Sequence, residues 1–97
     1  MTPGSLISEI CIWRVGRSEK YPDGVKYRLA LVDPDAKKVL LLFDNHWPKG
    51  HHVHVGSTES RFAFTTVETL IYIFDERSTM KEKEYREGKK EQNQESR

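Results

Sequence analysis

The sequence places all of its histidines in one short stretch, DNHWPKGHHVHVG, which spans residues 44–56. The four histidines are His46, His51, His52 and His54. Imidazole gains and loses a proton near neutral pH, so such a cluster can transfer protons, coordinate a metal ion or bind phosphate groups. In an extended chain successive side chains alternate between faces. We therefore expect His52 and His54 on one face, and Val53 and Val55 on the core-facing side.

The first interpretation of this cluster is cleavage of RNA. That reaction needs a base for the 2'-hydroxyl, an acid for the leaving oxygen and a cation for the phosphorane charge. We predict four catalytic residues: His46, Lys49, His52 and His54. We predict four substrate-binding residues: Asp44, Asn45, Trp47 and Arg61. This mechanism uses no metal and no other cofactor.

Two other interpretations stay open. In the first, the chain is a non-enzymatic interaction protein whose histidine loop binds a transition metal ion or a partner protein. The i, i+2 spacing of His52 and His54, with Asp44 nearby, suits a metal ion. In the second, the histidines of a polar turn only form hydrogen bonds and pack. Trp47 lies in the same turn, where an exposed ring could contact a base or a partner side chain.

Composition limits the class of protein. A chain of 97 residues predicts one domain. The single cysteine, Cys11, excludes an internal disulfide and a multi-cysteine zinc site, and its apolar surroundings predict a core thiol. The longest apolar run, residues 39–43, is too short to cross a membrane, and the N-terminus lacks a signal-type segment. We therefore expect a cytoplasmic protein with no membrane partner.

The apolar pattern predicts an antiparallel sheet of four or five strands. Long strands are expected at residues 6–15, 25–32 and 39–43, and short ones at 53–56 and 60–64. The turn Asp33-Pro34-Asp35-Ala36 joins the second strand to the third, and this hairpin is expected at the middle of the sheet. Because the third strand is apolar at every position, it should be covered on both faces. Trp13 and Phe62 are expected in the core.

The period then changes to that of a helix. Thr65 and Glu68 match a capping box, and apolar residues follow at helical spacing, so a helix should begin near Thr66 and pack one face on the sheet. The fold class is therefore α+β. We assign residues 1–80 to a single domain and residues 81–97 to a charged extension, helical to about Gly88 and then disordered. Removal of this extension should leave the fold intact.

The segment from Asp44 through Phe74 resembles the TumE-type toxin family of small prokaryotic toxin–antitoxin modules. Its members carry an Asp-Asn core, a Lys/His-Gly-x-His-x-His element, a short aromatic strand and a final helix. The matching positions here are Asp44, Asn45, His46, Lys49, Gly50, His52 and His54. The resemblance implies a growth inhibitor that acts on RNA or translation, and a cognate antitoxin with a DNA-binding domain. The expected partners are thus this antitoxin and RNA or the ribosome. A homodimer is a separate expectation.

Overall fold

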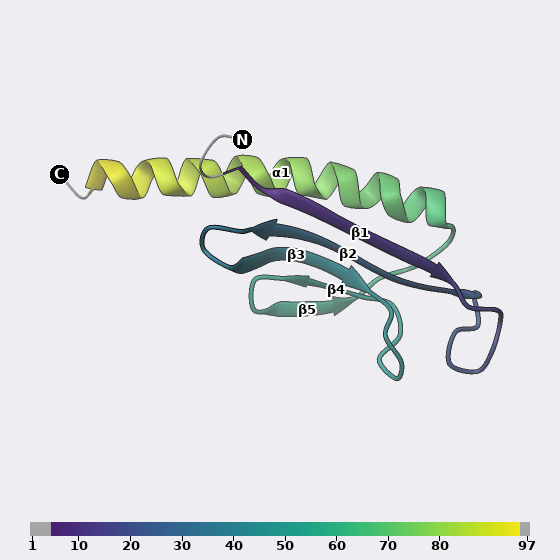
Figure 1. Cartoon of the computed structure of the whole chain (residues 1–97). Coiled ribbons are helices and arrows are strands. Elements are labelled where there is room, and N and C mark those ends of the chain that lie inside the picture. Colours follow the sequence, from purple (N-terminus) through teal and green to yellow (C-terminus); the bar gives the residue numbers. More distant parts are fainter. Residues whose placement is uncertain (1–4, 96–97) are drawn as a thin grey trace.

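A five-stranded antiparallel sheet carries one long helix against one of its faces (Figure 1). The computed structural model describes the backbone of residues 5–95 and the side chains through Gly88. The elements are β1 (Ile7–Arg14), β2 (Val25–Asp33), β3 (Lys38–Asp44), β4 (His52–Val55), β5 (Thr58–Arg61) and α1 (Val67–Glu95). The α+β class and the C-terminal helix are confirmed.

The strands pair in chain order, which places β3 at the centre of the sheet and β1 and β5 at its edges. The predicted central hairpin of β2 and β3 is therefore confirmed. Its turn is held by Asp33, whose Oδ1 accepts hydrogen bonds from the backbone N–H groups of Asp35 at 3.0 Å and Ala36 at 3.2 Å. An aspartate at this position commonly stabilises a turn in this way, because its side chain reaches the backbone two or three residues ahead.

The side of the sheet that faces α1 forms the hydrophobic core. Alternate residues of β2, β3 and β4 point to this side, as their period of two requires. Together with two helix residues they form one buried cluster: Tyr27, Leu29, Leu31, Leu41, Phe43, Val53, Leu70 and Phe74. Burial of each large apolar side chain contributes about 1.5–3 kcal/mol. The predicted inward direction of Val53 is thus confirmed.

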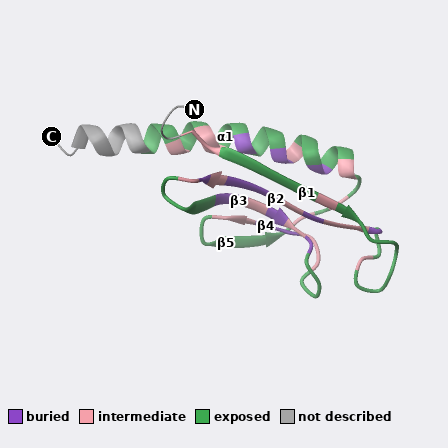
Figure 2. Ribbon diagram, viewed as in Figure 1, coloured by how far each residue is buried: buried purple, intermediate pink, exposed green. Residues whose placement is uncertain are grey.

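Helix α1 begins one residue later than its sequence predicts. Thr66, and not Thr65, is the N-cap, because its Oγ1 accepts the backbone N–H of Thr69 at 3.1 Å. Leu70 and Phe74 face the sheet one turn apart, and Figure 2 shows the buried positions along this side of the helix. No helix within residues 5–95 is long and apolar enough to cross a membrane.

The helical backbone continues through residue 95, past the predicted end at Gly88. Its charged part is also tied to the sheet, since the Tyr85 hydroxyl donates to Oδ2 of the buried Asp33 at 2.6 Å. The boundary at residues 80 and 81 between domain and extension stays a prediction. The sequence predicts disorder after Gly88, but the backbone of residues 89–95 is helical. Residues 96–97 and the side chains beyond Gly88 lie outside the described structure.

The second face of the sheet is open, and this overturns several predictions. No helix or strand of residues 5–95 covers it, so β3 is not covered on both faces. Trp13 is 47% exposed and Cys11 is exposed, because both point from the edge strand β1 to this open face. The fifth strand ends at Arg61 instead of continuing to residue 64. Phe62 follows it and packs on the core as predicted, edge to face with Phe43 at 5.1 Å.

Candidate functional site on the open face of the sheet

Strand pairing brings most of the predicted site residues together on the open face. The cross-strand register aligns one row of four side chains: Arg28, Asp44, His52 and Arg61. A second row, two residues further along β4, pairs His54 with Glu59. Directly opposed residues of antiparallel strands lie on the same face of the sheet. The predicted shared direction of His52 and His54 is therefore confirmed. Arg28 lies on the same face, opposite Asp44 on the neighbouring strand.

His52 is the most buried member of the group, with 6% of its surface exposed. Its Nδ1 lies 2.7 Å from the Gly50 carbonyl oxygen, which can only accept, so this nitrogen carries a proton. Its Nε2 lies 3.1 Å from Asp44 Oδ1 and 3.9 Å from Glu59 Oε1. Since both nitrogens face acceptors, both contacts are hydrogen bonds only when the ring is doubly protonated.

Gly50 shapes this arrangement through its backbone. Its φ of 75° lies in the left-handed region, which a residue with a side chain enters only at a cost. In this conformation the carbonyl oxygen of Gly50 reaches the ring two residues ahead. A glycine at position 50 therefore allows the backbone conformation that orients the ring of His52.

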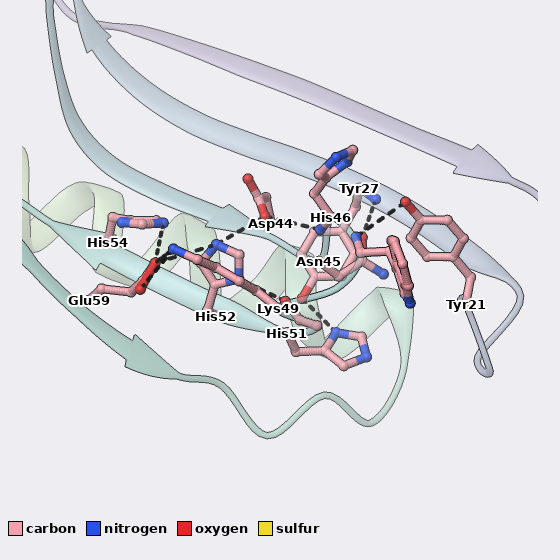
Figure 3. A network of polar contacts seen from close by, with 12 residues as sticks. Tyr21, Tyr27, Asp44, Asn45, His46, Lys49, His51, His52, His54 and Glu59 are labelled. Atoms are coloured by element: carbon pink, nitrogen blue, oxygen red, sulfur yellow. Dashed lines mark hydrogen bonds and ion pairs between the residues drawn. The ribbon is translucent and has the colours of Figure 1, made fainter. Parts of the chain in front are cut away.

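Glu59 is the hub of the cluster. Its carboxylate accepts hydrogen bonds from Lys49 Nζ at 2.8 and 3.2 Å and lies 3.2 Å from His54 Nε2 (Figure 3). The hydrogen bond from Lys49 is the main cause that lowers the pKa of Glu59, with further contributions from the charges of Lys49 and the two histidines. Glu59 is therefore ionised at neutral pH and accepts hydrogen bonds from the groups around it.

The sequence interpretation missed Glu59, although a signal for it was present. Gly56 and Ser57 form a two-residue connection between β4 and β5, and such a connection places the residues before and after it in register. Counting outward from this turn pairs His54 with Glu59. The register could have been counted only if β5 had been started at Thr58 and not at Ser60.

A shallow hollow of about 390 Å³ opens beside this cluster. Its lining consists of Pro48, Lys49, His52, Glu59, Ser60 and Arg61. Arg61 forms no ion pair with any side chain of the described part of the chain, and its guanidinium has donors in a fork that fits a phosphate. The hollow can therefore receive an anionic group between Arg61 and the imidazole of His52.

Three predicted site residues do not join this cluster. Asn45 is buried, and its amide is engaged by the backbone: Oδ1 accepts from Tyr27 N–H at 2.9 Å, and Nδ2 donates to the Val25 carbonyl at 2.8 Å. The His46 ring is directed away from Lys49 and Glu59 (Figure 3) and is exposed. Trp47 is 48% exposed, with the Lys20 ammonium 4.9 Å from its ring centre.

His51 lies on the opposite side of β4 and has a different environment. Its Nδ1 is 2.8 Å from the Tyr27 hydroxyl, its Nε2 is 2.8 Å from Asp23 Oδ2, and its ring stacks on Phe64 at 4.6 Å between centroids. Burial, followed by the charges of Asp44 and Asp23, raises the pKa of Tyr27, so its phenol is neutral. His51 thus links the loop before β2 to the sheet.

Comparison with known proteins adds one finding. A family model described as Toxin TumE matches residues 4–86. The match includes the first strands, whereas the resemblance in the sequence was confined to the segment from Asp44 through Phe74. Among curated proteins and solved structures, none matches the chain.

Proposed function

The chain belongs to the TumE toxin family, and from this membership we propose that it arrests growth by cleaving RNA. A toxin of this family is one half of a toxin–antitoxin module, so an antitoxin partner is implied. The RNA target is our proposal, and it depends on the open face of the sheet. There the groups needed for phosphodiester cleavage lie around one hollow.

The observation that carries the proposal is the meeting of cations and proton-transfer groups at this hollow. Lys49 and Arg61 line it together with His52, and His54 adjoins it through Glu59. The cations of Lys49 and Arg61 at the wall of the hollow can bind the phosphate and stabilise the charge that develops on it. Positioned imidazoles and carboxylates contribute factors of about 10²–10⁴ to such reactions through proton transfer.

We assign complementary roles to the two histidines. His52 is the proton donor, because its Nδ1 is fixed by Gly50 and its Nε2 contacts acceptors. His54, with the ionised Glu59 at 3.2 Å, is the proton acceptor for the 2'-hydroxyl. The 2'-oxygen then attacks the phosphorus, the bond to the 5'-oxygen breaks, and that oxygen takes the proton of His52. A cyclic phosphate and a free 5'-hydroxyl are the products.

Growth arrest and RNA cleavage together test the proposal. Expression of the chain without its antitoxin should stop growth, and the purified protein should cleave RNA in excess chelator to give cyclic phosphate ends. His54→Ala should abolish both, whereas His46→Ala, a change of the same residue type outside the cluster, should retain both. Thermal melts of the two variants should agree with the parent protein. Growth arrest by His54→Ala at the parental level would refute the assignment, and arrest without cleavage would indicate action by binding.

The finer partner predictions follow from the same proposal. A toxin that cleaves RNA acts in the cytoplasm, on free RNA or on the ribosome, and its antitoxin is expected to carry a DNA-binding domain. Co-expression with the neighbouring gene product should restore growth and yield a co-purifying complex. Light scattering of the isolated toxin should distinguish the predicted homodimer from a monomer.

A further inference from the structure

We propose that His52, His54 and Glu59 also form a binding site for a divalent transition metal ion, with Zn²⁺ as the representative ion. Two imidazole nitrogens and one carboxylate oxygen are ligands that Zn²⁺ prefers in proteins. One atom from each residue lies within 4.8 Å of the other two. The binding site goes beyond the proposed function, since it requires no RNA.

The separations of the ligand atoms are close to those of a bound ion. With metal–ligand bonds of about 2.0–2.2 Å, neighbouring ligands of a tetrahedral ion lie about 3.3–3.6 Å apart. Glu59 Oε1 is 3.2 Å from His54 Nε2 and 3.9 Å from His52 Nε2. The ring centroids lie 4.7 Å apart with the planes at 78°, so the rings pack edge to face, and both Nε2 atoms lie near the same Glu59 oxygen. Small side-chain rotations complete the site.

The tautomer of His52 is already the one that a metal requires. A ligating histidine usually donates its second ring N–H to a carboxylate or a backbone carbonyl, which fixes the ring and leaves the other nitrogen for the ion. The 2.7 Å contact between His52 Nδ1 and the Gly50 carbonyl has this form. The adjacent carboxylate of Asp44, 3.1 Å from Nε2, adds negative charge beside the ion.

Lys49 occupies a cation position of the same cluster. Its ammonium contacts both oxygens of Glu59, at 2.8 and 3.2 Å, where it balances the charge of the carboxylate. A divalent ion bound to Glu59 must compete with this ammonium and is repelled by it. Removal of the Lys49 charge should therefore strengthen metal binding, although the same change should weaken binding of a phosphate.

The metal and the proposed reaction exclude each other. A bound ion takes Nε2 of His52, the nitrogen that releases the proton in the proposed reaction, and it also fixes the ring of His54. The ion and the RNA therefore compete for the same two rings. In this part the inference rests on the proposed function: added Zn²⁺ should inhibit cleavage of RNA, and chelator should restore it. A requirement for Zn²⁺ in cleavage would refute the inhibitory role and the assigned acid–base roles.

Direct titration of the untagged full-length chain tests the site itself. Calorimetry with Zn²⁺ and visible absorption with Co²⁺ should show one ion per chain. His54→Ala and Glu59→Gln should each lower the affinity by at least about tenfold, by analogy with the loss of groups that support a metal. His46→Ala should bind as the parent protein does, and Lys49→Met should bind more tightly. Melts without metal should show that each variant is folded. Of the two ligand variants, Glu59→Gln is the milder change, because glutamine keeps the size and shape of the side chain.

Three results would overturn the metal site. They are the absence of saturable binding to the parent protein, full binding by both His54→Ala and Glu59→Gln, and weaker binding by Lys49→Met. None of these measurements uses RNA. An inactive protein that binds Zn²⁺ therefore contradicts only the proposed function, and an active ribonuclease that binds no Zn²⁺ contradicts only the metal site.

Discussion

Replacement of Asn45 by alanine separates a structural residue from a substrate-binding one. The sequence predicts that Asn45 binds substrate, but its amide joins the end of β3 to the beginning of β2. Oδ1 accepts the Tyr27 N–H at 2.9 Å, and Nδ2 donates to the Val25 carbonyl at 2.8 Å. Only 3% of the residue is exposed, so water cannot take over these bonds. We expect Asn45→Ala to lower the stability of the fold.

The magnitude follows from the two lost hydrogen bonds. A protein hydrogen bond contributes about 0.5–1.5 kcal/mol net, and a buried group left without a partner costs about 1–3 kcal/mol. Tyr27 is buried and Val25 is half-buried, so one partner incurs the full penalty and the other a smaller one. The free energy of unfolding should fall by about 2–4 kcal/mol. In a domain of this size that lowers Tm by roughly 10–30 °C.

Urea unfolding and thermal melts of the purified variant measure this change directly. His46→Ala is the matched control, because it alters the next residue, whose ring is exposed, and should change stability by no more than about 0.5 kcal/mol. Growth arrest by Asn45→Ala should fall only as far as the folded fraction falls. A variant that melts within a few degrees of the parent protein and yet fails to arrest growth would refute the structural role. Asn45 would then contact substrate, as the sequence predicts.

Three further outcomes test other parts of the structure. Tyr85→Phe should lower the free energy of unfolding in urea by about 1–3 kcal/mol, because it removes a hydrogen bond to the buried Asp33 carboxylate. Truncation after residue 80 also removes Tyr85 and should lower it by at least as much. Truncation after Gly88 keeps Tyr85 and should lower it by less. This differs from the harmless truncation that the sequence predicts, and equal stability of all these chains would support the sequence instead. The pKa of Tyr27 is raised, mainly by burial, so the folded state keeps the phenol proton to a higher pH than the unfolded chain does. The free energy of unfolding should therefore be constant below the ordinary phenol pKa of about 10 and should fall as pH rises above it. Tyr27→Phe should flatten that fall in unfolding measured between about pH 8 and 11, and an unchanged slope would contradict the assignment. The exposed Cys11 should react with a thiol reagent in the native protein as fast as in urea, and protection until unfolding would place it in the core.

Local periodicity determined much of the secondary structure and the direction of the histidine pair. Alternation along residues 25–32 and 52–55 fixes which side chains share a face, because the period of an extended strand is two whatever surrounds it. The sequence alone therefore separated His52 and His54 from Val53 and from the core. The change to helical spacing after Thr66 depends equally on local geometry. It gave the correct helix with an N-cap displaced by one residue.

The tertiary structure alone decided which groups meet. Glu59 reaches Lys49 and His54 only because β5 pairs with β4 in one register, and a slip of one residue would turn Glu59 to the other face. Asn45 and His46 are neighbours, and both are polar. The amide of Asn45 nevertheless bonds to the backbone of β2, whereas the ring of His46 is exposed to solvent. The exposure of Trp13 depends on the position of α1, which covers one face of the sheet only. Strand pairing and helix placement join residues that are far apart in the chain, and periodicity within one segment carries no information about them.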